Sequence, residues 1–185
     1  GPDLARDVRV IAGELKKHDV WVVLMPNNQF DKPFTTYILM CFSMGRDDAY
    51  WRKGLTRQQK LDEQRQFYEL SKYLLTTYKE TGKTFVLQHW EGDWLIRGNY
   101  DRKIDPQPEA IIGMIDWLNT RQQAVDDAMR DVPHTNVAVF LYTEVNRVRD
   151  AMLNAPTNNQ RLVNTVLPYV TNLDFVSWSS YDGMD

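Results

Sequence analysis

The fold of this chain is indicated first by residues 136–142, which read Asn-Val-Ala-Val-Phe-Leu-Tyr. After the asparagine the stretch is apolar and rich in β-branched and aromatic residues. A short apolar run of this kind is typical of a strand that is buried on both faces of a parallel sheet. Three further stretches have the same character and predict strands: Val20–Met25, Thr84–Gln88 and Leu173–Trp178.

Amphipathic helices are predicted between these strands. Apolar residues recur at helical spacing in three segments, Leu4–Lys17, Ile111–Met129 and Arg161–Val170. A fourth helix is predicted from a capping box formed by Thr56 and Gln59, an apolar stripe, and a C-terminal cap at Gly82; the stripe consists of Phe67, Leu70, Leu74 and Tyr78. Phe34–Ser43 is apolar and is compatible either with a strand or with a short helix at the mouth of a long loop.

Strands that alternate with amphipathic helices predict an α/β fold of parallel βα repeats. No glycine-rich dinucleotide fingerprint and no phosphate-binding loop follows any strand, which favours a TIM-barrel-like sheet over an open nucleotide-binding sheet. A complete barrel of eight units needs about 250 residues. We therefore expect residues 1–185 to form one domain with a partial or incomplete barrel, as a fragment of a larger barrel or as a small open domain.

The last predicted strand is followed by no covering helix, and an uncovered edge strand tends to pair with another chain. We therefore expect further polypeptide, or a partner subunit in an assembly, to complete the sheet.

Composition excludes several classes of function. The net charge of −3 and a pI near 5.6 argue against nucleic acid as a partner. No apolar run reaches the length of a membrane span. Cys41 is the single cysteine, and the three histidines lack the spacing of a helical zinc motif. Neither a metal site nor a cofactor is expected, and Cys41 is interpreted as inert packing.

Polar residues gather where the predicted strands end, and in parallel βα folds the loops at that edge form the site. Acidic and tryptophan residues lie side by side there. An indole face stacks on the C–H groups of a pyranose, carboxylates and amides bind its hydroxyls, and a pair of carboxyl groups cleaves the glycosidic bond. The predicted binding residues are Asn27, His89, Trp90, Asp93, Trp94, Arg97, Asn146 and Tyr181, and the predicted catalytic residues are Glu144, Glu91 and Asp182.

Glu144 is the sharpest of these candidates because it ends a fully apolar strand. Burial beside Tyr142 and indole rings would raise the pKa of its carboxyl group, as a general acid requires. A structural alternative is that Glu144 pairs with Arg147 or Arg149 and organises a loop.

Structural alternatives also exist for the other candidates. Asp93 could cap a turn, and His89 could be a hydrogen-bonded core histidine. Arg97 could pair with Asp93 or Asp101 in place of an acidic substrate group. Asp182 could belong to a frayed chain end.

The strand ends resemble the central strands of a (β/α)8 glycoside hydrolase from Thr84 onward. The similarity is carried by QHWEGDW (residues 88–94), YTEVN (142–146) and SWSSYD (177–182). In the large retaining clan with this barrel, the acid/base glutamate ends the fourth strand. Glu144 occupies that position if Val20–Met25 is the second strand. An asparagine precedes the glutamate in that clan, whereas Thr143 precedes Glu144 here, and the clan's nucleophile on the seventh strand has no counterpart in this chain.

The resemblance implies a glycoside hydrolase-like protein that acts on an oligo- or polysaccharide, with Glu144 as general acid/base. It also favours a secreted or extracytoplasmic location. A second carboxylate about 5–5.5 Å away would imply retention of configuration, and about 6.5–9.5 Å would imply inversion. Two other interpretations stay open: a non-catalytic scaffold that binds glycan or protein, and one subunit of an assembly.

Overall fold

The computed structural model describes residues 30, 33–43, 46–152 and 159–183. The predicted helix at Leu4–Lys17, the predicted strand at Val20–Met25 and the candidate binding residue Asn27 lie outside the described residues.

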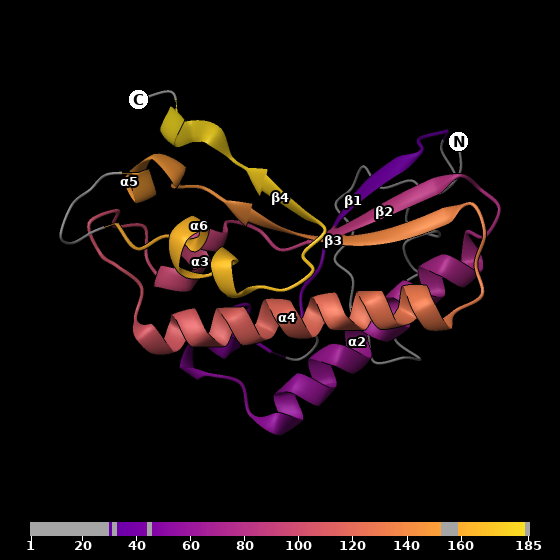
Figure 1. Ribbon diagram of the computed structural model, residues 1–185, viewed down its shortest axis with the longest axis horizontal. Coiled ribbons are helices and arrows are strands. Elements are labelled where there is room, and N and C mark those ends of the chain that lie inside the picture. Colours follow the sequence, from indigo (N-terminus) through magenta and orange to yellow (C-terminus); the bar gives the residue numbers. More distant parts are fainter. Residues whose placement is uncertain (1–29, 31–32, 44–45, 153–158, 184–185) are drawn as a thin grey trace.

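Four parallel strands form one sheet, and their order in the sheet follows their order in the sequence (Figure 1). They are β1 (Thr36–Met40), β2 (Lys83–Gln88), β3 (Val137–Val145) and β4 (Phe175–Trp178). The predicted parallel α/β fold is therefore confirmed. The segment that the sequence left open, Phe34–Ser43, contains edge strand β1.

The two long helices, α2 (Arg57–Thr77) and α4 (Pro108–Asp131), lie on the same face of the sheet (Figure 1). The capping box predicted at Thr56 is present at the start of α2. The predicted cap at Gly82 is wrong, because α2 ends at Thr77 with Tyr78 as its cap. Gly82 has a φ of +71°, which a glycine tolerates, in the turn that leads into β2.

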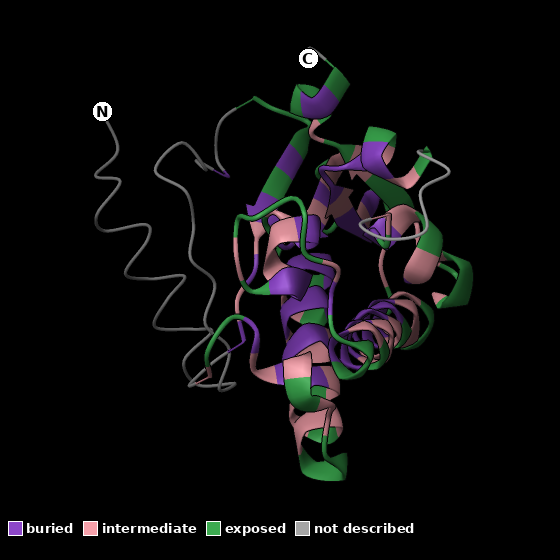
Figure 2. Cartoon of the chain, turned by 90° about the vertical axis from the view of Figure 1, so that its left-hand side faces the viewer, coloured by how far each residue is buried: buried purple, intermediate pink, exposed green. Residues whose placement is uncertain are grey.

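The main core fills the space between this face and the helices, where the buried residues of Figure 2 are concentrated. Alternate strand residues point into it, so Phe85 and Leu87 of β2 are buried together with Leu141 of β3. They pack with α2 and α4 through residues such as Leu74 and Ala128.

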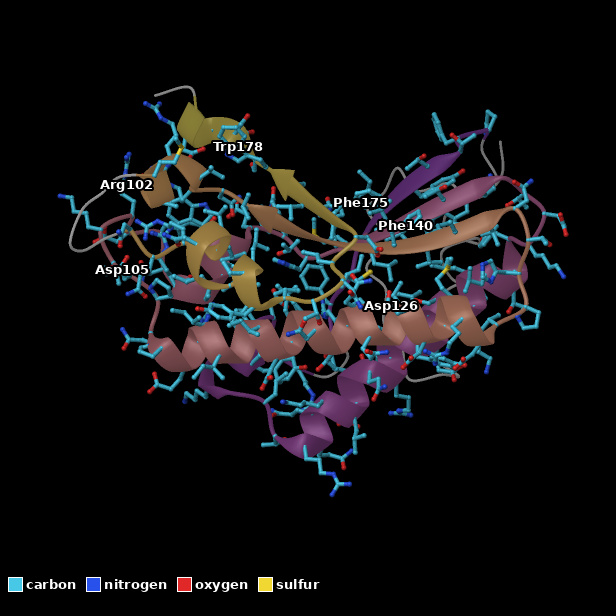
Figure 3. All side chains as sticks on the ribbon, in the orientation of Figure 1. Arg102, Asp105, Asp126, Phe140, Phe175 and Trp178 are labelled. Carbon is cyan, nitrogen blue, oxygen red and sulfur yellow. The ribbon has the colours of Figure 1, made fainter. Side chains whose placement is uncertain are left out.

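The opposite face of the sheet is more open. Ile38 of β1 and Phe175 of β4 are 51% and 50% exposed. Phe140 and Phe175 lie next to each other on adjoining strands, with ring centroids 5.3 Å apart in an edge-to-face arrangement (Figure 3). This face carries apolar side chains that the described helices do not cover.

Short helices follow the carboxyl ends of the strands. They are η1 (Tyr50–Lys53), α3 (Gly92–Arg97), α5 (Val148–Met152), α6 (Leu162–Thr165), η2 (Leu167–Tyr169) and η3 (Ser180–Gly183). One prediction is corrected here: the helix predicted over Arg161–Val170 is two short turns, α6 and η2. A second core cluster, including Trp51, Met114 and Leu162, packs these turns against α4. Among the described residues, no helix is long and apolar enough to cross a membrane.

Candidate functional site

Glu144 lies within β3, because that strand runs to Val145, beyond its predicted end at Tyr142. Side chains alternate along a strand, so Glu144 shares the open face of the sheet with Tyr142. In the parallel register, Ser177 of β4 is the partner of Glu144. The candidate acid therefore stands on the open face at the carboxyl edge of the sheet.

The Glu144 carboxylate accepts a hydrogen bond from the backbone that follows the neighbouring strand β2. The main-chain N–H of Glu91 donates to Oε2 of Glu144 at 2.5 Å. The two arginines proposed as structural partners bind other acids: Arg147 forms an ion pair with Asp150, and the main-chain N–H of Arg149 donates to Asp182. The contact with Glu91 thus joins two of the three predicted catalytic residues.

Local backbone geometry explains why Glu91 and Glu144 meet. Glu91 has a left-handed conformation, with φ +51° and ψ +57°, immediately before α3. Such a conformation costs a residue with a side chain roughly 1–3 kcal/mol and is concentrated at functional sites. A Cβ atom on the following Gly92 would lie 2.3 Å from the carbonyl oxygen of Glu144. Only glycine lets the start of α3 approach β3 this closely.

The carboxyl group of Glu91 has a raised pKa. Partial burial is the larger cause and the negative charge of Glu144 is the second. Like charges close together disfavour double ionisation, so protonating one carboxyl group relieves the pair. A carboxyl group with a raised pKa is the kind that general acid chemistry uses.

His89 lies at the end of β2, one residue past the strand, and is buried. Its Nε2 shares a 2.5 Å hydrogen bond with Oγ1 of Thr143. Burial is the main reason that the pKa of His89 falls to about 3, the charge of Arg121 adds to the effect, and the backbone of Trp90 opposes it. His89 is therefore neutral at pH 7 and cannot supply a positive charge to the site.

A pocket of about 220 Å³ opens beside Glu91. It lies among the ends of β1 and β2, the region of η1, and helices α3 and α4. Trp90, one of the predicted stacking residues, is 54% exposed at this pocket. The other lining residues are Cys41, Phe42, Ser43, Asp48, Arg52, His89, Glu91, Trp94, Leu95, Gly98, Asn99, Tyr100, Trp117 and Arg121.

A buried polar cluster adjoins this pocket and was missed by the sequence reasoning. Glu63 of α2 accepts hydrogen bonds from Ser43 Oγ, Tyr50 OH, Trp117 Nε1 and Arg121 Nε, the last at 2.5 Å. Burial and the adjacent Glu63 carboxylate raise the pKa of Tyr50 above its usual range. The available signal was that Glu63 and Arg121 stand at core positions of otherwise apolar helix stripes, where charged residues are almost always paired.

Asp93 and Asn146 hold two loops together. Asp93 Oδ2 accepts the main-chain N–H groups of Asn146 and Arg147 at 2.7 and 3.0 Å, and Oδ1 accepts that of Leu162 at 2.9 Å. Asn146 Oδ1 accepts the N–H of Asp93 at 3.1 Å. These side chains are buried and occupied, while their predicted role in hydroxyl binding stays a prediction.

Arg97 and Trp94 form a stacked pair on α3. The Arg97 guanidinium lies 4.3 Å from the Trp94 ring centroid. Arg97 Nε donates to the Asp93 carbonyl and Nη1 to that of Asp101, so it contacts both residues through their main chains. Burial is the main cause that lowers the pKa of Arg97 to about 10.

Asp182 also has structural partners. Its Oδ2 accepts the main-chain N–H of Arg149 at 2.8 Å, at the start of α5, and its Oδ1 accepts Trp178 Nε1 at 3.0 Å. Neighbouring Tyr181 is exposed. No described contact joins either residue to Glu144, and their predicted site roles stay predictions.

The described part of the chain contains no group of three or more His, Cys, Asp or Glu that could hold a metal ion. Cys41 is buried at the pocket, and burial is the main cause that raises its pKa to about 12. A thiol with so high a pKa is a poor nucleophile at neutral pH.

No protein-family model, curated protein or solved structure matches this chain. The side chains described above are thus the basis for any assignment of function.

Proposed function

We propose that this chain is a glycoside hydrolase-like protein that acts on an oligo- or polysaccharide. The observation that carries the proposal is the hydrogen bond from the main-chain N–H of Glu91 to the Glu144 carboxylate at the carboxyl edge of a parallel sheet, where Glu91 also lines a pocket with aromatic side chains. Acidic groups supply the proton transfers of glycoside hydrolysis, and indole rings supply the stacking surface for sugar.

The sheet supports a partial barrel as the framework. Right-handed crossovers between parallel strands in sequential order place every crossover helix on one face, as in a (β/α)8 barrel, and leave the other face to line the barrel interior. Helices α2 and α4 share one face (Figure 1), and the alternation of side chains along β3 places Glu144 on the other. Because β1 is a strand, Glu144 ends the fourth strand only if Val20–Met25 is the first and not the second.

Hydrolysis adds water across the glycosidic bond. One carboxyl group donates its proton to the glycosidic oxygen as the bond to the anomeric carbon breaks. The other carboxylate takes a proton from the attacking water, which inverts the configuration, or attacks the anomeric carbon itself and is later displaced by water, which retains it. The raised pKa of Glu91 supports Glu91 as the proton donor, which departs from the sequence prediction that gave the acid/base role to Glu144.

The direct test replaces Glu144 by glutamine and measures hydrolysis over a panel of neutral oligo- and polysaccharides. We expect the rate to fall by at least about 100-fold, because removal of a general acid or base typically costs 10²–10⁴-fold. Glu109→Gln is the matched control, since Glu109 is an exposed glutamate on α4 outside the pocket. Unchanged hydrolysis by Glu144→Gln, with an unchanged melting curve, would exclude Glu144 from the mechanism.

A non-catalytic glycan-binding scaffold is the second candidate. It is favoured by the 2.5 Å hydrogen bond that occupies one oxygen of Glu144. This alternative predicts glycan binding without turnover, which survives Glu144→Gln and is lost in Trp90→Ala.

A role as one subunit of an assembly is favoured by the exposed apolar side chains Ile38 and Phe175 on the open face. The mass in solution tests it: a clean monomer would argue against this role, and a stable oligomer would support it.

A further inference from the structure

The inner wall of the pocket contains a buried cation with one unused donor. Arg121 of α4 is 1% exposed and lines the pocket, and its Nη1 has no hydrogen-bond partner within the described structure. Native proteins leave few buried polar atoms unpaired, and each one calls for a missing partner or another explanation.

Arg121 cannot easily turn to satisfy this donor by itself. Its Nε donates to Glu63 and its Nη2 to Ser43 Oγ at 3.1 Å. The guanidinium also lies 3.6 Å from the ring centroid of Trp117 and 4.1 Å from that of Phe67. Three sets of contacts fix the plane of the group, so Nη1 keeps its direction. A ligand oxygen in the pocket would complete the set.

The volume sets the size of the ligand. An engineered apolar cavity of about 150 Å³ holds one benzene molecule. A pocket of about 220 Å³ therefore has room for one six-membered ring with its substituents. Ser43 and Arg121 line the pocket and are buried together with Glu63, so the pocket is closed on that side.

The charges favour a neutral ligand. The positive charge of Arg121 is already matched by Glu63 in a 2.5 Å ion pair. Among the lining residues, Arg52 adds one positive charge and Asp48 one negative charge, while Glu91 has a raised pKa. A carboxylate ligand would add another negative charge to a poorly solvated space, whereas a hydroxyl or ring oxygen accepts from Nη1 without that cost.

We propose that this pocket binds the single neutral pyranose unit at the end of a glycan chain. Arg121 Nη1 donates to one oxygen of the sugar, and Trp90 and Tyr100 contact the ring at the mouth. The inference rests on the proposed function, which it deepens: because Glu91 belongs both to the pocket and to the carboxylate pair, cleavage would release units from a chain end.

Binding is tested with the intact chain and the free monosaccharides glucose, galactose, mannose, xylose and glucuronate, by ligand-observed NMR and tryptophan fluorescence. We expect saturable binding of at least one neutral sugar and weaker or no binding of glucuronate. Arg121→Lys should weaken binding about tenfold, the value of one lost charge-assisted hydrogen bond. Preferential binding of glucuronate, or equal binding by Arg121→Lys, would overturn the proposal.

A second variant covers the case in which Arg121→Lys does not fold. Tyr100 is 75% exposed and lines the pocket, so Tyr100→Ala should fold normally and bind sugar a few-fold more weakly. Tyr169→Ala is the matched control, because Tyr169 is 65% exposed and lies outside the pocket. Equal losses in the two tyrosine variants would count against the pocket.

Product analysis separates this inference from the proposed function. Release of single sugars from a chain end supports both. Hydrolysis at internal bonds, with no monosaccharide binding, would support the proposed hydrolase activity and contradict the proposed binding of a terminal sugar in the pocket. Monosaccharide binding with no hydrolysis would support the proposed sugar pocket and contradict the proposed hydrolase activity.

Discussion

Two pairs of acidic residues at the carboxyl edge of the sheet have opposite surroundings. Asp93 and Asp182 are buried, and their carboxylates accept hydrogen bonds from main-chain N–H groups and an indole that hold the loops and short helices in place. Glu91 and Glu144 are less buried. The one hydrogen bond described for their carboxylates runs from the main-chain N–H of Glu91 to Glu144. The acidic residues at the strand ends therefore fall into two groups. The carboxylates of Asp93 and Asp182 accept structural hydrogen bonds, whereas those of Glu91 and Glu144 keep oxygens that a substrate can reach.

The largest effect is expected for Asp93→Ala. This change leaves three buried main-chain N–H groups without their acceptor, at about 1–3 kcal/mol each when unrelieved, and we expect a loss of about 3–5 kcal/mol in the free energy of unfolding. Glu144→Gln should lose less than about 1 kcal/mol, because glutamine keeps an acceptor oxygen. Urea unfolding measures both free energies. Equal losses in the two variants would contradict the distinction between the two pairs.

The next largest effect is the contribution of His89 to the loss of stability at low pH. Because its folded-state pKa is about 3 and its ordinary value is 6.5, the unfolded chain binds the proton first as pH falls. This contribution to stability is complete above pH 6.5 and is lost as pH falls toward 3, at about 1.4 kcal/mol per pH unit. The stability difference between the wild type and His89→Gln should shrink over that window in urea titrations, and a constant difference would argue against a neutral buried His89.

Asp182→Ala should have a smaller effect of about 1–3 kcal/mol, because it removes one acceptor from the start of α5 and one from Trp178. Glycan hydrolysis measured below the melting temperature should be retained. A loss of hydrolysis without a loss of stability would instead move Asp182 into the catalytic group predicted from the sequence.

The smallest expected effect is electrostatic and lies within the less buried pair. Glu144→Gln removes the charge that contributes to the raised pKa of Glu91, so that pKa should fall toward its ordinary value. A carbon-detected NMR titration of the Glu91 side chain measures the shift, with Glu109→Gln as control. An unchanged Glu91 titration would show that the two carboxyl groups do not interact.

Much of the fold could be predicted because buried strands and helices place apolar residues at regular intervals in the sequence. The apolar strand at Thr84–Gln88 and the capping box at Thr56 were both found within a residue or two of their observed positions. Helix α3 was missed because it begins with Gly92, directly after the left-handed Glu91, a composition typical of a loop. Its position depends on packing against β3, which the local sequence does not encode.

The site was predictable only in part for the same reason. Trp90 and Glu91 follow an apolar strand, and this placement at the carboxyl edge is set by topology. The partners of Asp93 come from segments 53 and 69 residues away, so its role as a loop anchor required the folded structure. Arg121 and Glu63 lie on two different helices, and their pairing beside the pocket depends on how α2 packs against α4.

The central claim is that Glu91 and Glu144 act as one unit. It is tested most directly by the rate of glycan hydrolysis in the wild type, Glu91→Gln, Glu144→Gln and the double variant. We expect each single change to cost at least about 100-fold and the double change to cost little more than the worse single change, because residues that act together lose activity non-additively. Full activity in either single variant, or multiplicative losses in the double variant, would contradict the claim.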